Sequence, residues 1–266
     1  MDSKKRAPPN TSCKRHETLG TLSQPNICVV IPTYNERENI ERLLMGLDSA
    51  FRNLNAGGSI IIVDDNSADG TAVLAAKFRA SCADIKVVVR PDKLGVGSAI
   101  LQGLERGFES KPKARFFFQM DADLSHPPEL LGNLVGALLQ GHDVVVGSRY
   151  CLGGRIVGWP ALRRVVSRAA NSYARMVLGL PVRDVTSGFK GYTRDVVSHL
   201  LRGGVVSEGY SFQVEMLFKL RRAGFGIVEH PITFVERRSG RSKLGLREVV
   251  TFLYAVPAFR LLRRQR

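Results

Sequence analysis

The sequence predicts an α/β protein with a doubly wound, mostly parallel sheet of the Rossmann type. Over the first 150 residues, short apolar and β-branched runs alternate with longer amphipathic segments. The short runs are almost continuously apolar, which is typical of strands buried on both faces of a parallel sheet. Strand–helix alternation favours one sheet covered by helices on both sides. With 266 residues, 44% of them apolar, the chain is long enough for such a core.

Five strands are predicted in the front part of the chain, over 27–31, 59–63, 86–89, 115–120 and 143–147. The amphipathic segments between them predict helices over 36–54, 70–82, 96–108 and 127–140. Beyond residue 150 the pattern indicates helices over 159–178 and 211–224, and a strand pair or one long edge strand over 226–237. We divide the chain into a basic, flexible tail (1–26), a folded domain (27–245) and an amphipathic, basic, membrane-proximal segment (246–266).

The composition restricts the partners. The net charge is +15, and residues 237–266 hold nine Arg and Lys against one acid. Such a balance suits nucleic acid, an anionic membrane surface or phosphate-rich substrates. Four widely spaced cysteines without a C-x-x-C pair argue against structural zinc and a disulfide framework. The longest apolar stretch, 249–262, is interrupted by Pro257 and Arg260 and is shorter than the ~20 residues of a spanning helix.

Acidic residues follow three of the predicted strands, where open α/β sheets bind their ligands. "MDADLSHPPEL" places Asp121 and Asp123 at the tip of a buried strand. Buried carboxylates need partners, and a divalent metal is one candidate. A lone D-x-D is more often a solvated loop that caps the next helix. The acids in "PTYNERE" and "DDNSADG", after two other strands, weaken that alternative.

The remaining junctions allow two readings each. "GVGSAI" has Ile100 where a dinucleotide fingerprint needs a small residue, and it follows the third strand. Its glycines are therefore expected to serve a tight turn and close packing. "PTYNERE" fits a helix capping box, but Tyr34 could stack on a base. Asp65 could form an Asx turn or accept a hydrogen bond from a ribose or base.

Seven segments together indicate one protein family far more specifically than any single segment does. "VVIPTYNERENI", "IIIVDDNSADGT", "RPDKLGVGSAILQG", "MDADLSHPPEL", "VVVGSRY", "TSGFKGY" and "FVERRSGRSKLG" occur in this order. From about residue 27 to about 252, the chain closely resembles the dolichol-phosphate mannosyltransferase family, within the inverting GT-A glycosyltransferases of family 2. The resemblance implies a GT-A domain over 27–245, followed by C-terminal amphipathic and basic helices.

The resemblance also implies the reaction and its residues. Mannose would pass from GDP-mannose to dolichyl phosphate with inversion, at the cytosolic face of the endoplasmic reticulum membrane, to supply N-glycan, GPI-anchor and O-mannosyl synthesis. Mg²⁺ or Mn²⁺ would be held by Asp121 and Asp123, with Ser125 where family members often have a glutamine ligand. The nucleotide sugar would be bound by Pro32, Tyr34, Glu36, Val63, Asp65, Asp121, Ala122, Asp123, Arg149, Arg237 and Lys243.

A phosphate acceptor has its own chemical needs. Its second pKa is ~6, so it is largely dianionic at neutral pH and needs a cationic cradle rather than a general base. Arg149, Arg163 and Arg164 are the candidates, since arginine forks suit phosphate oxygens. A solvated basic face is the alternative for Arg163 and Arg164. Asp121, Asp123 and Arg149 form the predicted catalytic set.

Other functions stay open at this point. A sister enzyme could use UDP-glucose on the same lipid, or a sugar hydroxyl could be the acceptor, which would require a catalytic carboxylate that no motif singles out. A nucleic-acid-binding protein would show aromatics interleaved on a basic stripe, whereas the C-terminal segment looks amphipathic, so no nucleic acid is expected. Residues 246–266 could lie in the membrane interface, pack on the domain or bind a small membrane-anchoring subunit.

Overall fold

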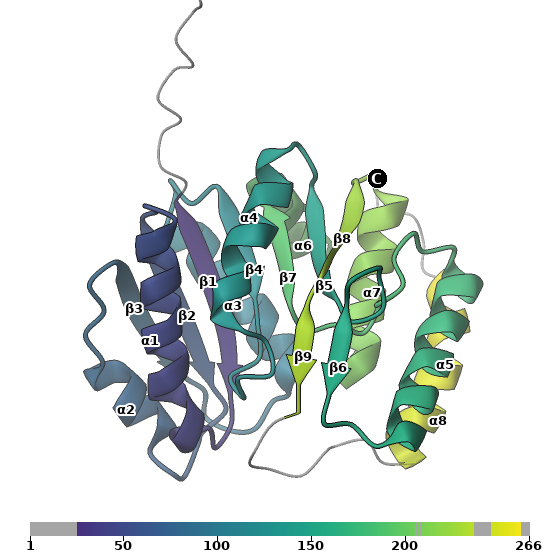
Figure 1. Cartoon of the computed structure of the whole chain (residues 1–266), viewed down its shortest axis with the longest axis horizontal. Coiled ribbons are helices and arrows are strands. Elements are labelled where there is room, and N and C mark those ends of the chain that lie inside the picture. The colour runs from purple at the N-terminus through teal and green to yellow at the C-terminus, as the bar shows by residue number, and fades with distance from the viewer. Residues whose placement is uncertain (1–25, 206, 208, 237–245, 262–266) are drawn as a thin grey trace, which may run out of the picture.

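The structure is a computed structural model that describes residues 26–205, 207, 209–236 and 246–261. The predicted tail over 1–26 lies outside these residues except for Asn26, and so do Arg237 and Lys243. The main feature is a seven-stranded sheet with the order β3-β2-β1-β4-β7-β5-β8 (Figure 1). A two-stranded sheet, β6-β9, stands beside it.

The five predicted strands all form. They are β1 (Ile27–Thr33), β2 (Gly58–Asp64), β3 (Ala83–Val89), β4 (Phe116–Gln119) and β5 (Val144–Ser148). The first, second, fourth and fifth are buried almost throughout, as their apolar sequences predict. β3 alternates between exposed and half-buried residues because it lies at the edge of the sheet.

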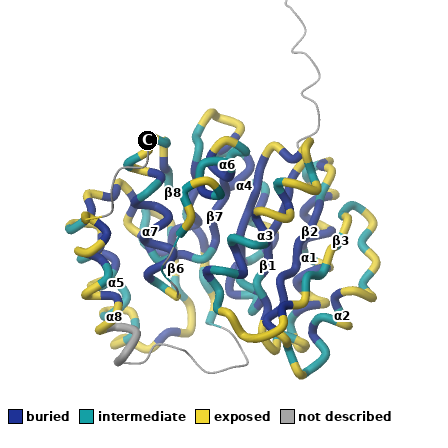
Figure 2. The backbone as a smooth tube through the Cα atoms, turned by 180° about the vertical axis from the view of Figure 1, so that it is seen from behind, coloured by how far each residue is buried: buried dark blue, intermediate teal, exposed yellow. Residues whose placement is uncertain are grey.

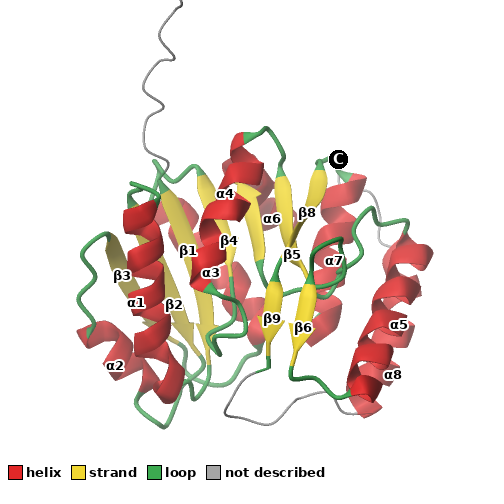
Figure 3. Ribbon diagram, in the orientation of Figure 1, coloured by secondary structure: helices red, strands yellow, loops and turns green. Residues whose placement is uncertain are grey.

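Helices cover both faces of the sheet (Figure 3). One core cluster joins the sheet to α1 (Arg37–Asn53), α2 (Thr71–Lys77) and α4 (Leu131–Leu139). The other joins it to α3 (Val96–Ser110), α5 (Ala161–Leu178), α6 (Arg194–Gly203), α7 (Gly209–Arg222) and α8 (Leu246–Ala258). Two 3-10 helices, η1 (Pro128–Leu130) and η2 (Phe259–Leu261), adjoin α4 and α8.

Strand β7 (Lys190–Thr193) was not predicted, and it lies between β4 and β5. It runs antiparallel to both neighbours. Its short sequence, KGYT, lacks the apolar run of the other central strands. Because β7 is antiparallel, the segment that leads into it lies at the edge of the sheet where the neighbouring parallel strands end.

The segment over 226–237 forms two strands rather than one long edge strand, but the two strands do not pair with each other. β8 (Ile227–Pro231) extends the main sheet beside β5, whereas β9 (Thr233–Val235) pairs with β6 (Arg155–Val157) in the small sheet. The sequence pattern did not predict β6, β7 or helix α6 over 194–203.

Helix α8 packs on the domain through one face. Phe252 and Val256 of α8, and Phe259 of η2, are buried in the core cluster that contains α5 and α7. The Tyr173 hydroxyl of α5 donates to the carbonyl of Leu253. Pro257 lies in the last turn of the helix, as expected of a residue that ends a helix. In the described part of the chain, every helix is too short or too polar to cross a membrane.

Candidate active site

A cavity of about 730 Å³ lies at the edge of the sheet where β1, β2, β4 and β5 end. Helices α5, α7 and α8 complete its wall. The predicted site residues that line it are Pro32, Tyr34, Glu36, Asp65, Asp121, Ala122, Asp123, Arg149 and Arg163. The sheet therefore brings together residues that are up to 131 positions apart in the sequence.

The end of the cavity beside β1 and β2 carries an exposed ring and a buried ion pair. The Tyr34 side chain is exposed, and the Lys93 ammonium lies 3.8 Å from the centre of its ring. Asp65 forms an ion pair with buried Arg90 and accepts from the backbone N–H of Gly95 at 3.1 Å. Gly95 has φ of 95°, which confirms that this glycine serves a tight turn.

The D-x-D segment forms a tight turn after β4. Leu124 has φ of 60°, a conformation that is uncommon for leucine. This turn lets the backbone N–H and hydroxyl of Ser125 donate to Asp123 Oδ1 at 3.1 and 2.5 Å. Ser125 itself is buried and is not among the residues that line the cavity. The structure thus shows Ser125 orienting Asp123, and its role as a metal ligand stays a prediction.

His126 holds the backbone of the other acid, Asp121. Its Nδ1 accepts from the backbone N–H of Asp121 at 3.2 Å, and its ring stacks on Phe189 with 5.4 Å between the ring centres. Burial lowers the pKa of His126 below its usual value, so the neutral ring with its proton on Nε2 is the form that fits. Burial in the cleft raises the pKa of Asp121, and the charge of Asp123 adds to this effect.

Two carboxylates that face one cavity fit a hard divalent cation. Mg²⁺ is commonly bound by one or two carboxylates together with substrate phosphates and water. Within the described residues no third Asp, Glu, His or Cys joins Asp121 and Asp123 as a ligand group. The donor set therefore fits a cation that shares its coordination with a bound diphosphate.

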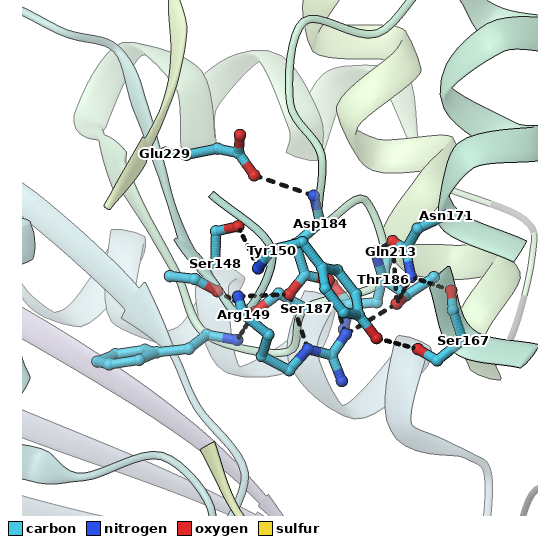
Figure 4. Close-up of polar contacts among 12 residues, drawn as sticks. Ser148, Arg149, Tyr150, Ser167, Asn171, Asp184, Thr186, Ser187, Gln213 and Glu229 are labelled. Atoms are coloured by element: carbon cyan, nitrogen blue, oxygen red, sulfur yellow. Dashed lines mark hydrogen bonds and ion pairs between the residues drawn. The ribbon is translucent and has the colours of Figure 1, made fainter. Parts of the chain in front are cut away.

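Arg149 follows β5 and is held by a buried acid (Figure 4). Its Nε and Nη2 donate to the two oxygens of Asp184 at 2.7 and 2.6 Å, and its backbone N–H donates to Oδ2 at 2.8 Å. Nη2 also donates to Thr186 at 3.0 Å, whereas Nη1 has no partner among the described residues. Burial alone would lower the pKa of Arg149, but Asp184 raises it above its usual value. The guanidinium therefore stays charged and keeps one amino group available to the cavity.

An aromatic wall supports a second cation. The Arg163 guanidinium lies 4.0 Å from the ring centre of Trp159 and donates to Glu236 at 2.5 Å. Trp159 packs edge-on against Phe234 with 5.3 Å between the ring centres. The Trp159 Nε1 and the Arg163 Nε are buried donors without a protein partner in the described part of the chain. Buried donors of this kind indicate an acceptor supplied by a ligand or by water.

The comparisons with known proteins show the family to which the chain belongs. The family model "Glycosyl transferase family 2" matches residues 28–201. The chain is 40% identical over 217 residues to the polyprenol monophosphomannose synthase of Mycolicibacterium smegmatis. This match covers 81% of the present chain and 80% of the relative. It is 39% identical over 222 residues to the undecaprenyl-phosphate mannosyltransferase of Micrococcus luteus, with 82% and 87% covered.

The chain belongs to glycosyltransferase family 2. Solved structures show the same fold. Glucosyl-3-phosphoglycerate synthase from Mycobacterium tuberculosis, in complex with UDP, has a TM-score of 0.61 at 22% identity and covers 90% of this chain and 81% of its own. Mannosyl-3-phosphoglycerate synthase from Rubrobacter xylanophilus has a TM-score of 0.62 at 19% identity, with 89% and 73% covered. These neighbours confirm the GT-A fold that the sequence predicts.

Some predicted residues of this family 2 enzyme lie away from the cavity. The Val63 side chain is fully buried in the core, and Arg164 is exposed on α5. Neither lines the cavity, and the proposed roles of Arg237 and Lys243 fall on residues outside the described part of the chain. Three polar residues outside the predicted set support the site or lie near it. Gln213 lines the cavity, Asp184 holds Arg149, and Glu215 pairs with Lys219 at 2.8 Å.

Several lining residues had no signal in the sequence. They are Lys93, His126, Trp159, Ser167, Asn171, Tyr210, Phe234 and Glu236. Single aromatic and polar residues carry no motif by themselves. The clearest signal is Trp159, which is the one tryptophan of the chain and directly precedes the helix that carries Arg163.

Proposed function

We propose that this protein transfers mannose from GDP-mannose to the phosphate of a polyprenyl lipid, with inversion and with a divalent metal. The observation that carries the proposal is that the two acids and the two cations expected for such a reaction, Asp121, Asp123, Arg149 and Arg163, line one cavity. Mannosyl transfer and the polyprenol class are supported by the names of the relatives at 40% and 39% identity. Guanine as the base rests on the resemblance of the motifs.

The leaving diphosphate belongs at the D-x-D turn. Asp121 and Asp123 would hold Mg²⁺ or Mn²⁺ there, and the cation would neutralise charge that develops on the β-phosphate. Ser125 holds Asp123 in place for this role through its hydroxyl. A solved neighbour that shares the fold contains Mn²⁺ together with UDP. Tyr34 at the far end of the cavity offers a flat ring to the base.

The acceptor phosphate belongs beside Arg149 and Arg163. A phosphate oxygen attacks the anomeric carbon, the bond from that carbon to the β-phosphate oxygen breaks, and the electron pair leaves on GDP. The acceptor is already dianionic, so no protein base has to remove a proton. Arg149 Nη1 is a donor without a described partner on this wall and can receive an acceptor oxygen. The Arg163 guanidinium lies over the same Trp159 ring, so its charge helps to bring the two anions together.

The lipid itself must come from a bilayer, and the structure offers a face for it. Helices α5 and α8 stand side by side at one end of the molecule, with much of their outer surface exposed (Figure 2). The exposed apolar side chains of these elements are Leu162, Val165 and Met176 of α5, Val250, Leu253 and Tyr254 of α8, and Leu261 of η2. Exposed arginines flank them, namely Arg164, Arg168, Arg175 and Arg260.

We assign this α5–α8 face to an anionic bilayer surface. The same two helices line the cavity through Val166, Ala170, Phe252 and Leu253, so a lipid phosphate can reach the site from this side. Each exposed arginine near anionic lipid contributes about 1 kcal/mol to binding. The predicted endoplasmic reticulum location, dolichol as the lipid, and small anchoring subunits remain predictions, since both relatives come from bacteria.

The activity is tested with labelled donors. Purified protein with Mg²⁺ or Mn²⁺ is incubated with GDP-mannose or UDP-glucose, and with dolichyl or undecaprenyl phosphate in detergent. Mannolipid from GDP-mannose that is abolished by EDTA is expected. Product from UDP-glucose alone would replace the proposal by a lipid-phosphate glucosyltransferase. Comparison of the two lipids decides between dolichol and the bacterial type of acceptor.

Membrane binding is tested by flotation with liposomes that contain phosphatidylglycerol. The double variant Leu162→Ser/Leu261→Ser should float several-fold less than the wild type, whereas Leu139→Ser on α4 should float equally. Both target leucines are exposed, so their replacement spares the core. Equal flotation of the double variant would show that the α5–α8 face is not the contact. A wild type that does not float but fractionates with cell membranes would favour an anchoring subunit.

A further inference from the structure

Gln213 forms part of the cavity floor and is held by a buried polar network. It lies in the first part of α7 and is only 5% exposed. Its Oε1 accepts from Gln119 Nε2 at 2.9 Å and from the Nζ of Lys190. Gln119 and Lys190 are both fully buried, on β4 and β7.

The network fixes which end of the Gln213 amide faces the cavity. Gln119 Nε2 also donates at 3.1 Å to the backbone carbonyl of Gly188, an atom that can only accept. The amide nitrogen of Gln119 is therefore fixed, and Gln213 must present its oxygen to it. Consequently the Gln213 Nε2 group, with two N–H donors, points away from the network. It has no partner among the described residues, and Gln213 lines the cavity.

The order of the strands shows what Gln213 faces. β7 lies between β4, which precedes the D-x-D acids, and β5, which precedes Arg149. The segment that enters β7 brings Gly188 so close to Asp121 that a Cβ on it would lie 2.8 Å from Oδ2. Gln213 is linked through Gln119 to Gly188 and lines the same cavity as the two acids and Arg149. In the proposed reaction, the transferred sugar lies between the leaving diphosphate and the acceptor phosphate.

We infer that Gln213 contacts the transferred hexose and donates a hydrogen bond from Nε2 to one of its hydroxyls. The inference rests on the proposed function and adds a residue to it. Gln119 and Lys190 act as positioning residues that hold the amide. The absence of a side chain at Gly188 leaves room for the ring beside Asp121.

The other amide on the cavity wall cannot take this role. Asn171 Nδ2 donates to the Ser167 carbonyl at 2.8 Å and to the Thr186 hydroxyl at 3.1 Å. Both of its N–H groups are therefore used within the protein. Gln213 differs because its oxygen carries the internal bonds and its nitrogen is left for a ligand.

The experiment uses two replacements of Gln213 that differ in charge. Gln213→Glu keeps an acceptor for Gln119 and Lys190 but offers the cavity an oxygen in place of N–H donors. Gln213→Met removes the donors without adding charge. The matched control is Gln140→Glu, at an exposed position that follows α4. Each full-length variant is assayed for kcat/KM with GDP-mannose at saturating lipid, and for the inhibition constant of GDP.

Both Gln213 variants should lose about 10- to 100-fold in kcat/KM, while the inhibition constant of GDP changes less than about threefold. If GDP binding and kcat/KM fall together, Gln213 acts on the nucleotide and the inference is wrong. Unchanged kcat/KM in Gln213→Glu also overturns it, even if Gln213→Met does not fold. A wild type that transfers no mannose would instead refute the proposed function, so the two failures are distinguishable.

Discussion

Replacement of Asp184 by asparagine should destabilise the protein strongly, although residue 184 does not line the cavity. Asp184 is fully buried and accepts three hydrogen bonds from Arg149. The substitution keeps the shape of the side chain but leaves the Arg149 guanidinium, 8% exposed, without its counter-charge. Breaking a buried pair in this way costs about 3–5 kcal/mol. For a domain of this size, the melting temperature should fall by roughly 6–20 °C.

A double-mutant cycle isolates the pair itself. Arg149→Met should cost a similar amount, because it leaves the Asp184 carboxylate buried and unpaired. Asp184→Asn/Arg149→Met removes both charges, so it should be less destabilised than the sum of the single variants by about 3 kcal/mol. The measurement is urea unfolding followed by circular dichroism. Asp195→Asn, an exposed acid on α6, serves as the matched control and should change stability by less than about 1 kcal/mol.

The result that refutes this reasoning is additivity. If the double variant loses the full sum, the guanidinium and the carboxylate do not stabilise one another. Arg149 would then be held by its contacts with Trp159 and Phe234, which lie 5.4 Å from the guanidinium carbon. If Asp184→Asn alone has only a small effect on stability, the ion pair likewise does not stabilise the protein.

Three further predictions concern the site. Asp123→Ala should abolish transfer with the fold intact by circular dichroism; residual activity that EDTA still removes would assign the metal elsewhere. Arg149→Ala should lower kcat/KM for the lipid more than the affinity for GDP, and calorimetry that shows only lost GDP affinity would contradict this. Burial lowers the pKa of Lys190 to about 7 from 10.5. Between pH 7 and 9 the Lys190 side chain therefore binds a proton more fully in the unfolded chain than in the folded chain. The free energy of unfolding of the wild type should rise by about 2–3 kcal/mol over this range, relative to that of Lys190→Met. A pH-independent difference in unfolding free energy would show that Lys190 stays charged.

The sequence by itself determined the class of fold and one side of the site. Local apolar runs and amphipathic periods predicted β1 to β5 and the helices between them, because those signals repeat every two or 3.6 residues. The D-x-D acids were nominated because strand ends mark the binding edge of such a sheet, and Arg149 was nominated by the family resemblance and because arginine forks suit phosphate oxygens. Those residues stand next to their strands in the sequence, so a local pattern could locate them.

Only the tertiary structure decided how the rest of the site is built. β7 is central in the sheet, yet three of its four residues are buried by their neighbours without an apolar run that marks them in the sequence. Arg149 meets Asp184 from 35 positions away, and Gln119 meets Gln213 from 94 positions away. No period or spacing encodes such contacts, because they depend on which strands are neighbours and on the direction in which β7 runs. For the same reason, the sequence could nominate Arg163 and Arg164 equally, whereas the orientation of α5 turns the first toward the cavity and the second toward solvent.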